Sequence, residues 1–396
     1  MPGPLDGVRV LEAGLLIQGP QAAALLGDMG ADVIKIELPG VGDQSRYITV
    51  APDDPRSAVF TACNRGKRSV SLDLRQARGA DIFKALVRTA DVFVSNFMPG
   101  TLENWGLAYE DLVEINDGII CAQGSTFGPL GPDAERKGAD LAGQAAGGLI
   151  STTGRDGDPP TPVGVFIADH VGSLNMVAGI LAALHARSTS GRGQRVDVSL
   201  LGGQIWAQAT EYTHFLLTDR VPGRANFGHP MIKAAYGIFE TADGWIGLVG
   251  VPPHARDGFF VAIERPDLAL DERLKGIAMP PEDLAWFKGE LAATFRTRTT
   301  AAWGAVLGEA GVRYAPVQDY AAAAADPGIW ENGYLAEVAD DAGLTQRVVG
   351  TPIRMGATPL SPGVEAPSLG EHTEDVLREI GIEADEMDAL RKQGTI

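Results

Sequence analysis

The chain has 396 residues, with 33 Lys or Arg against 51 Asp or Glu, so its formal net charge at neutral pH is −18. This excess of acid disfavours binding to nucleic acid or to an anionic membrane, and an anionic ligand would need a local group of cations. The two cysteines, Cys63 and Cys121, provide neither a disulfide framework nor a Cys-rich zinc site. The length is typical of two or three domains.

Several other features are typical of a soluble cytoplasmic protein. Residues 1–4 lack the basic and apolar regions of a secretory signal, and no apolar run approaches the roughly 20 residues that span a bilayer. The six His residues are scattered, without a His-x-x-x-His pair, so we expect no metal. A Gly-x-Ser-x-Gly sequence is also absent, which disfavours a hydrolase.

The first part of the chain alternates between short apolar strands and helices. Pro20 stands in the first turn of one such helix and Gly30 beyond its end, as helix termini favour. This alternation predicts an α/β fold whose mostly parallel sheet is covered by helices on both faces. Strands are expected at residues 8–12, 31–37, 69–74, 91–94 and 118–122, and helices at 20–29 and 76–89.

A long helix is predicted over residues 169–187, where Val171, Leu174, Val177 and Leu181 follow helical spacing. The Gly191-Arg192-Gly193 sequence ends it, and a strand is expected over residues 196–200.

A second, smaller α+β domain is predicted from a change of composition over residues 222–229, where Gly, Pro, Arg and Asn become frequent. Residues 236–251 alternate around Asp243-Gly244 like a hairpin, and the domain is expected to end near Val312. Further helices are expected at residues 283–296, 300–310, 321–325 and 371–380.

The first β-α-β unit could bind a dinucleotide at the turn that begins with Gly14. Such binding needs a Gly-x-Gly-x-x-Gly sequence, in which the central glycine lets the backbone approach the pyrophosphate. The sequence from Gly14 to Gly19 lacks that central glycine. We therefore expect the topology of a nucleotide-binding fold without NAD binding.

A basic segment at residues 64–69 contains Arg65, Lys67 and Arg68, and Arg75 follows the next predicted strand. In so acidic a chain, this concentration of cations is a candidate site for phosphate groups. The alternative is a solvated loop, and the spacing alone does not decide between them.

Asp169 stands where the long helix is expected to begin. As an N-cap it would accept hydrogen bonds from backbone N–H groups and contribute about 1 kcal/mol to stability. The same position suits chemistry, because a carboxylate there would stay ionised at pH 7 and free N–H groups could stabilise an acyl oxyanion. Both interpretations stay open on the residues alone.

Segments of recognisable sequence follow one another in order along the whole chain. They read PLDGVRVLE at 4–12, GADVIKIE at 30–37, NFMPG at 96–100, ADH at 168–170, GRGQRVDVSL at 191–200 and APSLGEHT at 366–373, together with residues 64–74. In this order they resemble the class III CoA-transferases, the family of formyl-CoA transferase and carnitine CoA-transferase.

The resemblance implies a fold, a partner and a set of site residues. It implies a large Rossmann-like CoA-binding domain built from residues 1–220 and 313–396, a small domain at 221–312, and an interlocked homodimer. Coenzyme A and acyl-CoA would be substrates, with no permanently bound cofactor. The catalytic aspartate falls on Asp169, and the CoA-contacting positions fall on Leu72, Asp73, Leu74, Arg75, Asn96, Phe97 and Lys137.

The chain also departs from the family pattern. Formyl-CoA transferases have a glutamine at the position of Ile17, whereas here Gln18 comes one residue later, and Ala139 and Asp140 replace a tyrosine and a glutamate. Their four-glycine loop has no counterpart over residues 250–258, which argues against formate or oxalate as substrate. The alternative of a 2-methylacyl-CoA racemase is weakened because its histidine position falls on Ala139 and no second carboxylate stands at 251–254.

The family mechanism implies that Asp169 attacks an acyl-CoA thioester and then carries CoA as an aspartyl thioester. Helix N–H groups would hold the oxyanion, Gln18 and Asp140 would position the acyl group, and Arg75, Lys137 and Arg46 would face the CoA phosphates. Arg224 and His229 could pair with a second carboxylate of a dicarboxylic substrate or serve as ordinary loop contacts. The identity of the acyl donor and acceptor is left open.

Overall fold

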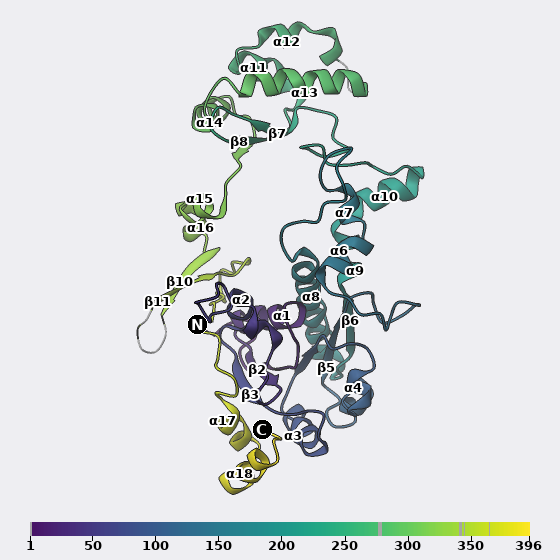
Figure 1. The fold of residues 1–396 in the computed structure, drawn as a ribbon, viewed down its shortest axis with the longest axis vertical. Helices are drawn as coiled ribbons and strands as arrows, with labels where there is room; N and C mark the ends of the chain where they lie inside the picture. The colour runs from purple at the N-terminus through teal and green to yellow at the C-terminus, as the bar shows by residue number, and fades with distance from the viewer. Residues whose placement is uncertain (1, 276–278, 340–342, 344, 364) are drawn as a thin grey trace. The chain divides into compact units, whose positions relative to one another are not determined.

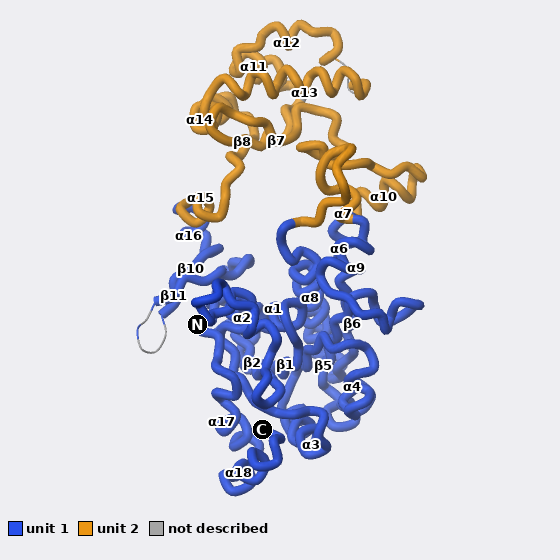
Figure 2. The backbone as a smooth tube through the Cα atoms, viewed as in Figure 1, with its two compact units in different colours: residues 1–148, 164–208, 327–396 blue, residues 149–163, 209–326 orange. Residues whose placement is uncertain are grey.

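The computed structural model describes residues 2–275, 279–339, 343, 345–363 and 365–396. The chain forms two compact units, of which the first comprises residues 1–148, 164–208 and 327–396 and the second residues 149–163 and 209–326 (Figure 2). The second unit thus includes residues 209–220 and 313–326 as well as the predicted small domain at 221–312. The first unit contains both ends of the chain.

A six-stranded sheet forms the centre of the first unit, in the order β3-β2-β1-β4-β5-β6 (Figure 1). Every neighbouring pair is parallel, which confirms the predicted parallel sheet. Its strands are β1 (Arg9–Glu12), β2 (Asp32–Glu37), β3 (Arg68–Ser71), β4 (Val92–Ser95), β5 (Ile120–Ser125) and β6 (Arg195–Ser199).

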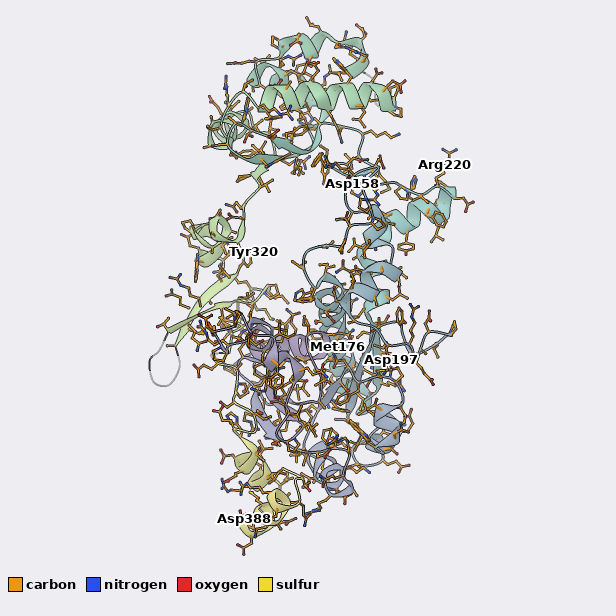
Figure 3. The ribbon with its side chains drawn as sticks, viewed as in Figure 1. Asp158, Met176, Asp197, Arg220, Tyr320 and Asp388 are labelled. Atoms are coloured by element: carbon orange, nitrogen blue, oxygen red, sulfur yellow. The ribbon has the colours of Figure 1, made fainter. Side chains whose placement is uncertain are left out.

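Helices cover both faces of this sheet because successive strand residues point to opposite sides. Val10 packs with helices α1 (Gln18–Asp28) and α8 (Ile167–Ser190), where Met176 lies buried inside the unit (Figure 3). Leu11 packs on the other face with α3 (Ala77–Val87). The C-terminal helices α17 (Thr373–Glu379) and α18 (Ala384–Lys392) join that second cluster.

Helix α8 is by length and composition apolar enough to cross a membrane, with a mean hydropathy of 1.5 over its best window. The sequence analysis did not identify such a segment. Core helices of soluble proteins pass the same test, so the helix is weak evidence for a membrane span. In the first unit it packs against α1, β5 and β6.

Shorter elements complete the first unit. They are η1 (Gln44–Tyr47), α2 (Ala58–Asn64), α4 (Thr101–Asn104), α5 (Tyr109–Val113), α6 (Asp140–Ala146), α9 (Leu200–Ala207), α16 (Pro327–Glu331), β10 (Leu335–Ala339) and β11 (Thr345–Val349).

The second unit has an antiparallel sheet of β7 (Tyr236–Glu240), β8 (Trp245–Val249) and β9 (Tyr314–Pro316). The first two strands form the predicted hairpin, and Phe239, Phe295 and Trp303 pack in the core beneath them. Its helices are α7 (Leu149–Thr152), α10 (Ala209–Thr218), η2 (Pro253–Ala255), α11 (Arg256–Ala262), α12 (Pro266–Leu270), η3 (Glu272–Leu274), α13 (Pro281–Phe295), α14 (Thr300–Glu309) and α15 (Tyr320–Ala324).

Candidate active site

Asp169 lies in the first turn of α8, two residues after the helix begins at Ile167. The N-cap residue is Phe166, so the prediction that Asp169 caps the helix is wrong. The capping acceptor is instead Asp140, the first residue of α6. Its Oδ1 accepts from the backbone N–H groups of Ala168 at 2.7 Å and of Asp169 at 3.1 Å. A carboxylate from a separate helix therefore performs the role expected of Asp169.

The backbone N–H groups of this first turn are all engaged. Besides the two bonds to Asp140, the N–H of Ile167 donates to the carbonyl of Val165 at 2.8 Å and that of His170 to the carbonyl of Phe166 at 3.0 Å. The expected oxyanion site made of free helix N–H groups is therefore wrong for this structure. An oxyanion beside Asp169 would need another donor.

Burial and a neighbouring charge raise the pKa of Asp169 to about 7, with desolvation the larger cause and the carboxylate of Asp140 the smaller. This contradicts the expectation of an ordinary carboxylate that is fully ionised at pH 7. The other oxygen of Asp140 accepts from Gln144 Nε2 at 2.6 Å. Asp140 is thus held by polar partners, whereas Asp169 is left poorly solvated when it is charged.

Gln18 places an amide group beside the same helix. It is the first residue of α1 and is 3% exposed, and its backbone carbonyl accepts a hydrogen bond from Ser173 Oγ of α8 at 2.7 Å. A Cβ atom on Gly172 would lie 2.9 Å from Gln18 Nε2, and one on Gly124 would collide with Gln18 Oε1. The amide therefore fits between these two glycines, and Gly172 is one helical turn after Asp169.

The Nε2 donor of Gln18 is buried and has no hydrogen-bond partner among the described residues. Buried amide donors in proteins are nearly always paired, so an unpaired one next to Gly172, one helical turn after Asp169, is a candidate ligand-binding group.

His170 faces a different neighbour. Its Nδ1 lies 2.5 Å from Gln21 Oε1 of α1, and burial lowers its pKa. The side chain thus joins α8 to α1, next to Asp169 in sequence but with its own hydrogen-bond partner.

A groove at the carboxyl ends of the strands contains most of the expected CoA-contacting residues. Leu72, Asp73, Leu74 and Arg75 follow β3, and Phe97 follows β4; together with Leu15 and Trp105 they line a cavity of about 170 Å³. Ligands of open α/β sheets bind at this edge. Asp73 holds Arg75 at 2.8 Å, and the Arg75 side chain remains 58% exposed.

Two of the expected CoA contacts lie elsewhere. Asn96 does not line the groove; its side chain pairs with both the N–H and the carbonyl of Leu15, at 2.7 and 2.8 Å. Lys137 is exposed on the segment that precedes α6 and does not line the groove. The structure thus brings residues 72–75 and Phe97 together.

The basic segment at residues 64–69 does not form an open phosphate site. Arg65 pairs with Asp28, and Lys67 Nζ contacts Glu12 Oε2 at 3.0 Å inside the protein. Arg68 pairs with Asp32 at 2.6 Å and with Glu379 at 2.5 Å.

Arg46, expected to face CoA phosphates, is also engaged within the protein. It donates to Glu37 at 2.7 and 2.8 Å and stacks over Phe60. The sequence could not reveal these pairings because every acidic partner comes from a distant segment or from another strand.

Side chains hold three backbone N–H groups of the turn between β1 and α1. The N–H of Gly14 donates to Glu12 Oε1 at 2.5 Å, that of Leu15 to Asn96, and that of Leu16 to Asp43 Oδ1 at 3.1 Å. These three groups are therefore engaged within the protein, and the expectation that the chain does not bind NAD stays a prediction. Glu12 and Asp43 were not expected to have this role; a charged residue in an apolar strand was the available signal for Glu12, whereas Asp43 lies before η1 and gave none.

Arg224 and His229 make contacts within the second unit. Arg224 Nη1 donates to the carbonyls of Thr153 and Pro159 at 3.0 and 3.1 Å. His229 Nε2 lies 2.9 Å from Glu211 Oε1. Among the residues that the structure describes, no group of three or more His, Cys, Asp and Glu side chains could hold a metal ion.

A comparison with known protein families decides what kind of protein carries this arrangement. The sequence model of CoA-transferase family III matches residues 5–373, which is nearly the whole chain. The chain belongs to CoA-transferase family III.

Named relatives of this family III chain are CoA-transferases. It is 35% identical to the succinyl-CoA:mesaconate CoA-transferase of Haloarcula hispanica, over 96% of this chain and 97% of that protein. It is 32% identical to the succinyl-CoA–D-citramalate CoA-transferase of Chloroflexus aurantiacus, over 100% and 98%. A crystal structure of a CaiB/BaiF family protein from Brucella suis superposes with a TM-score of 0.83, at 32% identity, over 96% of this chain and 100% of that one.

The family III chain is therefore an enzyme that transfers CoA between an acyl-CoA and a carboxylic acid. CoA thioesters are its substrates, and its α/β fold is that of the family.

Proposed function

We propose that this CoA-transferase works through a covalent thioester between CoA and Asp169. The observation that carries the proposal is the setting of this carboxylate: it is half-buried in the first turn of α8, senses the charge of Asp140, and has a pKa of about 7. A carboxylate that is poorly solvated when ionised is a reactive nucleophile. It also matches the position of the family's catalytic aspartate.

The reaction then proceeds in two halves. An Asp169 oxygen attacks the thioester carbonyl of the donor, the C–S bond breaks, and a mixed anhydride and CoA thiolate result. The thiolate attacks the aspartyl carbonyl of the anhydride, so that the donor acid leaves and aspartyl-CoA remains. The acceptor carboxylate attacks this thioester and releases the thiolate, which attacks the acceptor carbonyl of the new anhydride. The acceptor leaves as its CoA ester, and Asp169 is free again.

Gln18 and Asp140 have different roles in this proposal. The unpaired Nε2 donor of Gln18 stabilises the oxyanions, since the helix N–H groups are engaged by other acceptors. Asp140 acts on Asp169 through its capping bonds and its charge, in place of the expected contact with the acyl group.

We place the adenosine end of CoA in the groove of residues 72–75 and Phe97. Arg75 is the cation there with an exposed side chain, and it faces the CoA phosphates, with Lys137 as a second contact. Asn96 supports this site by holding Leu15, which lines the groove.

The substrates are proposed to be short dicarboxylic acids and their CoA thioesters. Both named relatives use succinyl-CoA, and mesaconate and citramalate are also dicarboxylic acids. A pairing of Arg224 or His229 with the second carboxylate stays a prediction.

We propose that the enzyme works in the cytoplasm. Its free thiols Cys63 and Cys121 are buried and suit reducing conditions.

We propose that two copies of the chain form an interlocked homodimer. Large apolar side chains of the first unit are exposed to solvent in the single chain: Leu141 of α6, Phe166 just before α8, Leu174 of α8, and Trp206 of α9, which is 74% exposed. A group of such residues on one unit is typical of a surface that another protein covers. A second copy would keep water away from the reacting groups.

The proposed mechanism is tested by incubating the enzyme with succinyl-CoA and measuring the mass of the peptide that contains Asp169. We expect a CoA adduct on this peptide in the wild type and none in Asp169→Asn, which should also lose CoA exchange. Full exchange by Asp169→Asn would contradict the mechanism.

A separate assay tests the racemase alternative. It measures deuterium uptake at C2 of a 2-methylacyl-CoA without an acceptor acid, and such uptake would favour the racemase.

A further inference from the structure

Four charged side chains lie buried beneath the turn that connects β1 with α1. Glu12, Lys35, Asp43 and Lys67 are each at most 4% exposed. They come from β1, from β2, from the segment after β2 and from the segment after α2. Two ammonium groups thus meet two carboxylates in the interior, and the charges balance.

Each ammonium group bridges acidic and backbone acceptors. Lys35 Nζ lies 3.1 Å from Glu12 Oε2, 2.9 Å from Asp43 Oδ2 and 3.1 Å from the carbonyl of Gly14. Lys67 Nζ lies 3.0 Å from Glu12 Oε2 and 2.8 Å from the carbonyl of Pro20. Glu12 is therefore shared by both lysines, and the network reaches the turn and the first turn of α1.

The two carboxylates of the network accept hydrogen bonds from backbone N–H groups of the turn. Glu12 accepts from the N–H of Gly14 and Asp43 from the N–H of Leu16. Leu16 has a φ of +64°, a left-handed conformation that is unfavourable for a residue with a Cβ atom. Such a conformation persists only where the surroundings impose it, and here the network supplies the bonds.

The turn leads directly into Gln18, whose amide lies between Gly124 and Gly172. A buried ion network is seldom the most stable way to fill space, because apolar side chains of similar size avoid the desolvation cost. An apolar filling would leave the N–H groups of Gly14 and Leu16 without acceptors. The network thus satisfies the turn and determines where α1 begins.

We infer that Glu12, Lys35, Asp43 and Lys67 form a positioning device that holds the strained turn and thereby places the Gln18 amide beside Asp169. These residues act through the turn and do not contact substrate, so they are positioning residues. The inference rests on the proposed function, because it assumes that Gln18 serves the chemistry at Asp169.

Lys67, a member of the device, titrates within the pH range of an activity assay. Burial lowers the pKa of Lys67 to about 8, despite the opposing charge of Glu12. The groups that face it are Glu12 from β1, Lys35 from β2, Cys63 and Asn64 from α2, and the carbonyl of Pro20 from α1. As the pH rises through this value Lys67 loses its charge, and Glu12 loses one of its two cationic partners.

The experiment measures the first-order rate of CoA-adduct formation on Asp169 at saturating succinyl-CoA, from pH 6 to pH 10. We expect the wild type to lose rate above about pH 8. Lys67→Met should form the adduct at least tenfold more slowly at pH 7.5 and show no such alkaline limb, while CoA binding changes less than about twofold. Lys392→Met, an exposed lysine in α18, is the matched control and should behave as the wild type.

A second variant separates positioning from folding. Leu16→Gly adopts the left-handed conformation without steric cost. Combined with Lys67→Met, it should restore part of the lost rate, because a glycine at position 16 keeps the left-handed conformation without support from the network. If Lys67→Met does not fold, Asp43→Ala takes its place, since it removes the acceptor of the Leu16 N–H, and adduct formation at the wild-type rate in this variant overturns the inference.

Wild-type rate and pH profile in Lys67→Met would equally overturn the inference while leaving the covalent mechanism intact. A wild type that forms no adduct on Asp169 would instead remove the proposed function, together with the inference that rests on it.

Discussion

At the residue scale, the proposed mechanism predicts that the pKa of Asp169 governs the pH dependence of the reaction. Because this pKa is about 7, the fraction of reactive carboxylate should fall as the pH drops below neutrality. Asp140→Asn removes the neighbouring charge but keeps an oxygen that can accept the two N–H bonds. We expect the acid limb of the rate of adduct formation to move to lower pH, while remaining above the range of an exposed Asp because burial, the larger cause, persists.

The measurement is a pH–rate profile for both proteins. An unchanged acid limb in Asp140→Asn would mean that Asp140 does not influence the ionisation of Asp169.

The same pKa makes a prediction about stability. A folded-state pKa raised above the unfolded value of 3.8 means that stability declines as the pH rises from about 4 to about 7. Asp169→Asn removes the poorly solvated charge, so it should gain up to about 4 kcal/mol in free energy of unfolding at pH 8 and little at pH 4. Urea unfolding at both pH values measures this, and an equal gain at both would contradict the assigned pKa.

Gly172 tests the placement of Gln18. An alanine there would push its Cβ to within 2.9 Å of Gln18 Nε2, the mobile end of a side chain, so the amide should move while the fold holds. We expect Gly172→Ala to slow adduct formation about tenfold with a stability change below about 1 kcal/mol. Gly289→Ala is the matched control, since this glycine also lies in a helix and meets nothing within 4 Å. Equal rates of adduct formation in Gly172→Ala and Gly289→Ala would mean that the position of Gln18 does not affect the reaction.

At the element scale, the last residues of the chain support the groove. The N–H of Asp73 donates to the carbonyl of Thr395 at 2.8 Å, and Gln76 bonds with Gly394 and with Thr395. Residues far apart in sequence thus hold the segment to which we assign CoA binding.

Gln76→Ala removes the side-chain part of this support. We expect CoA to bind about three- to tenfold more weakly, while the rate of adduct formation at saturating acyl-CoA stays the same. Calorimetric titration with CoA measures the change, with the exposed Gln393→Ala as control. A loss of rate at saturation without a loss of affinity would contradict this role.

A comparison of predicted and observed element bounds shows which elements the sequence patterns predict well. The strands β1, β2, β4 and β5 and the helix α8 lie within a few residues of their predicted positions, because apolar periodicity and glycine boundaries are local signals. The strand β3 ends at Ser71, three residues before its predicted end, since Leu72 and Leu74 are buried without continuing the strand.

At the scale of the whole molecule, the proposed dimer is tested through its apolar surface. Trp206→Glu places a charge among the exposed apolar side chains, and burying it in an interface would be costly. We expect the wild type to have the mass of two chains in light scattering and the variant to have the mass of one, with loss of activity. Leu270→Glu, at an exposed leucine of the second unit, should remain dimeric. A monomeric wild type would contradict the proposal.

The sequence by itself determined the α/β class, the parallel sheet and the family, because these depend on local periodicity and on segments that recur in order. It also singled out Asp169. Only the tertiary structure decided that Asp140 caps α8 from 29 residues away, that Lys67 and Arg65 are paired inside the protein, and that Asp169 titrates near neutrality. The reason is physical: the pairing and solvation of a charge depend on which distant segments meet around it, and no local pattern records that meeting.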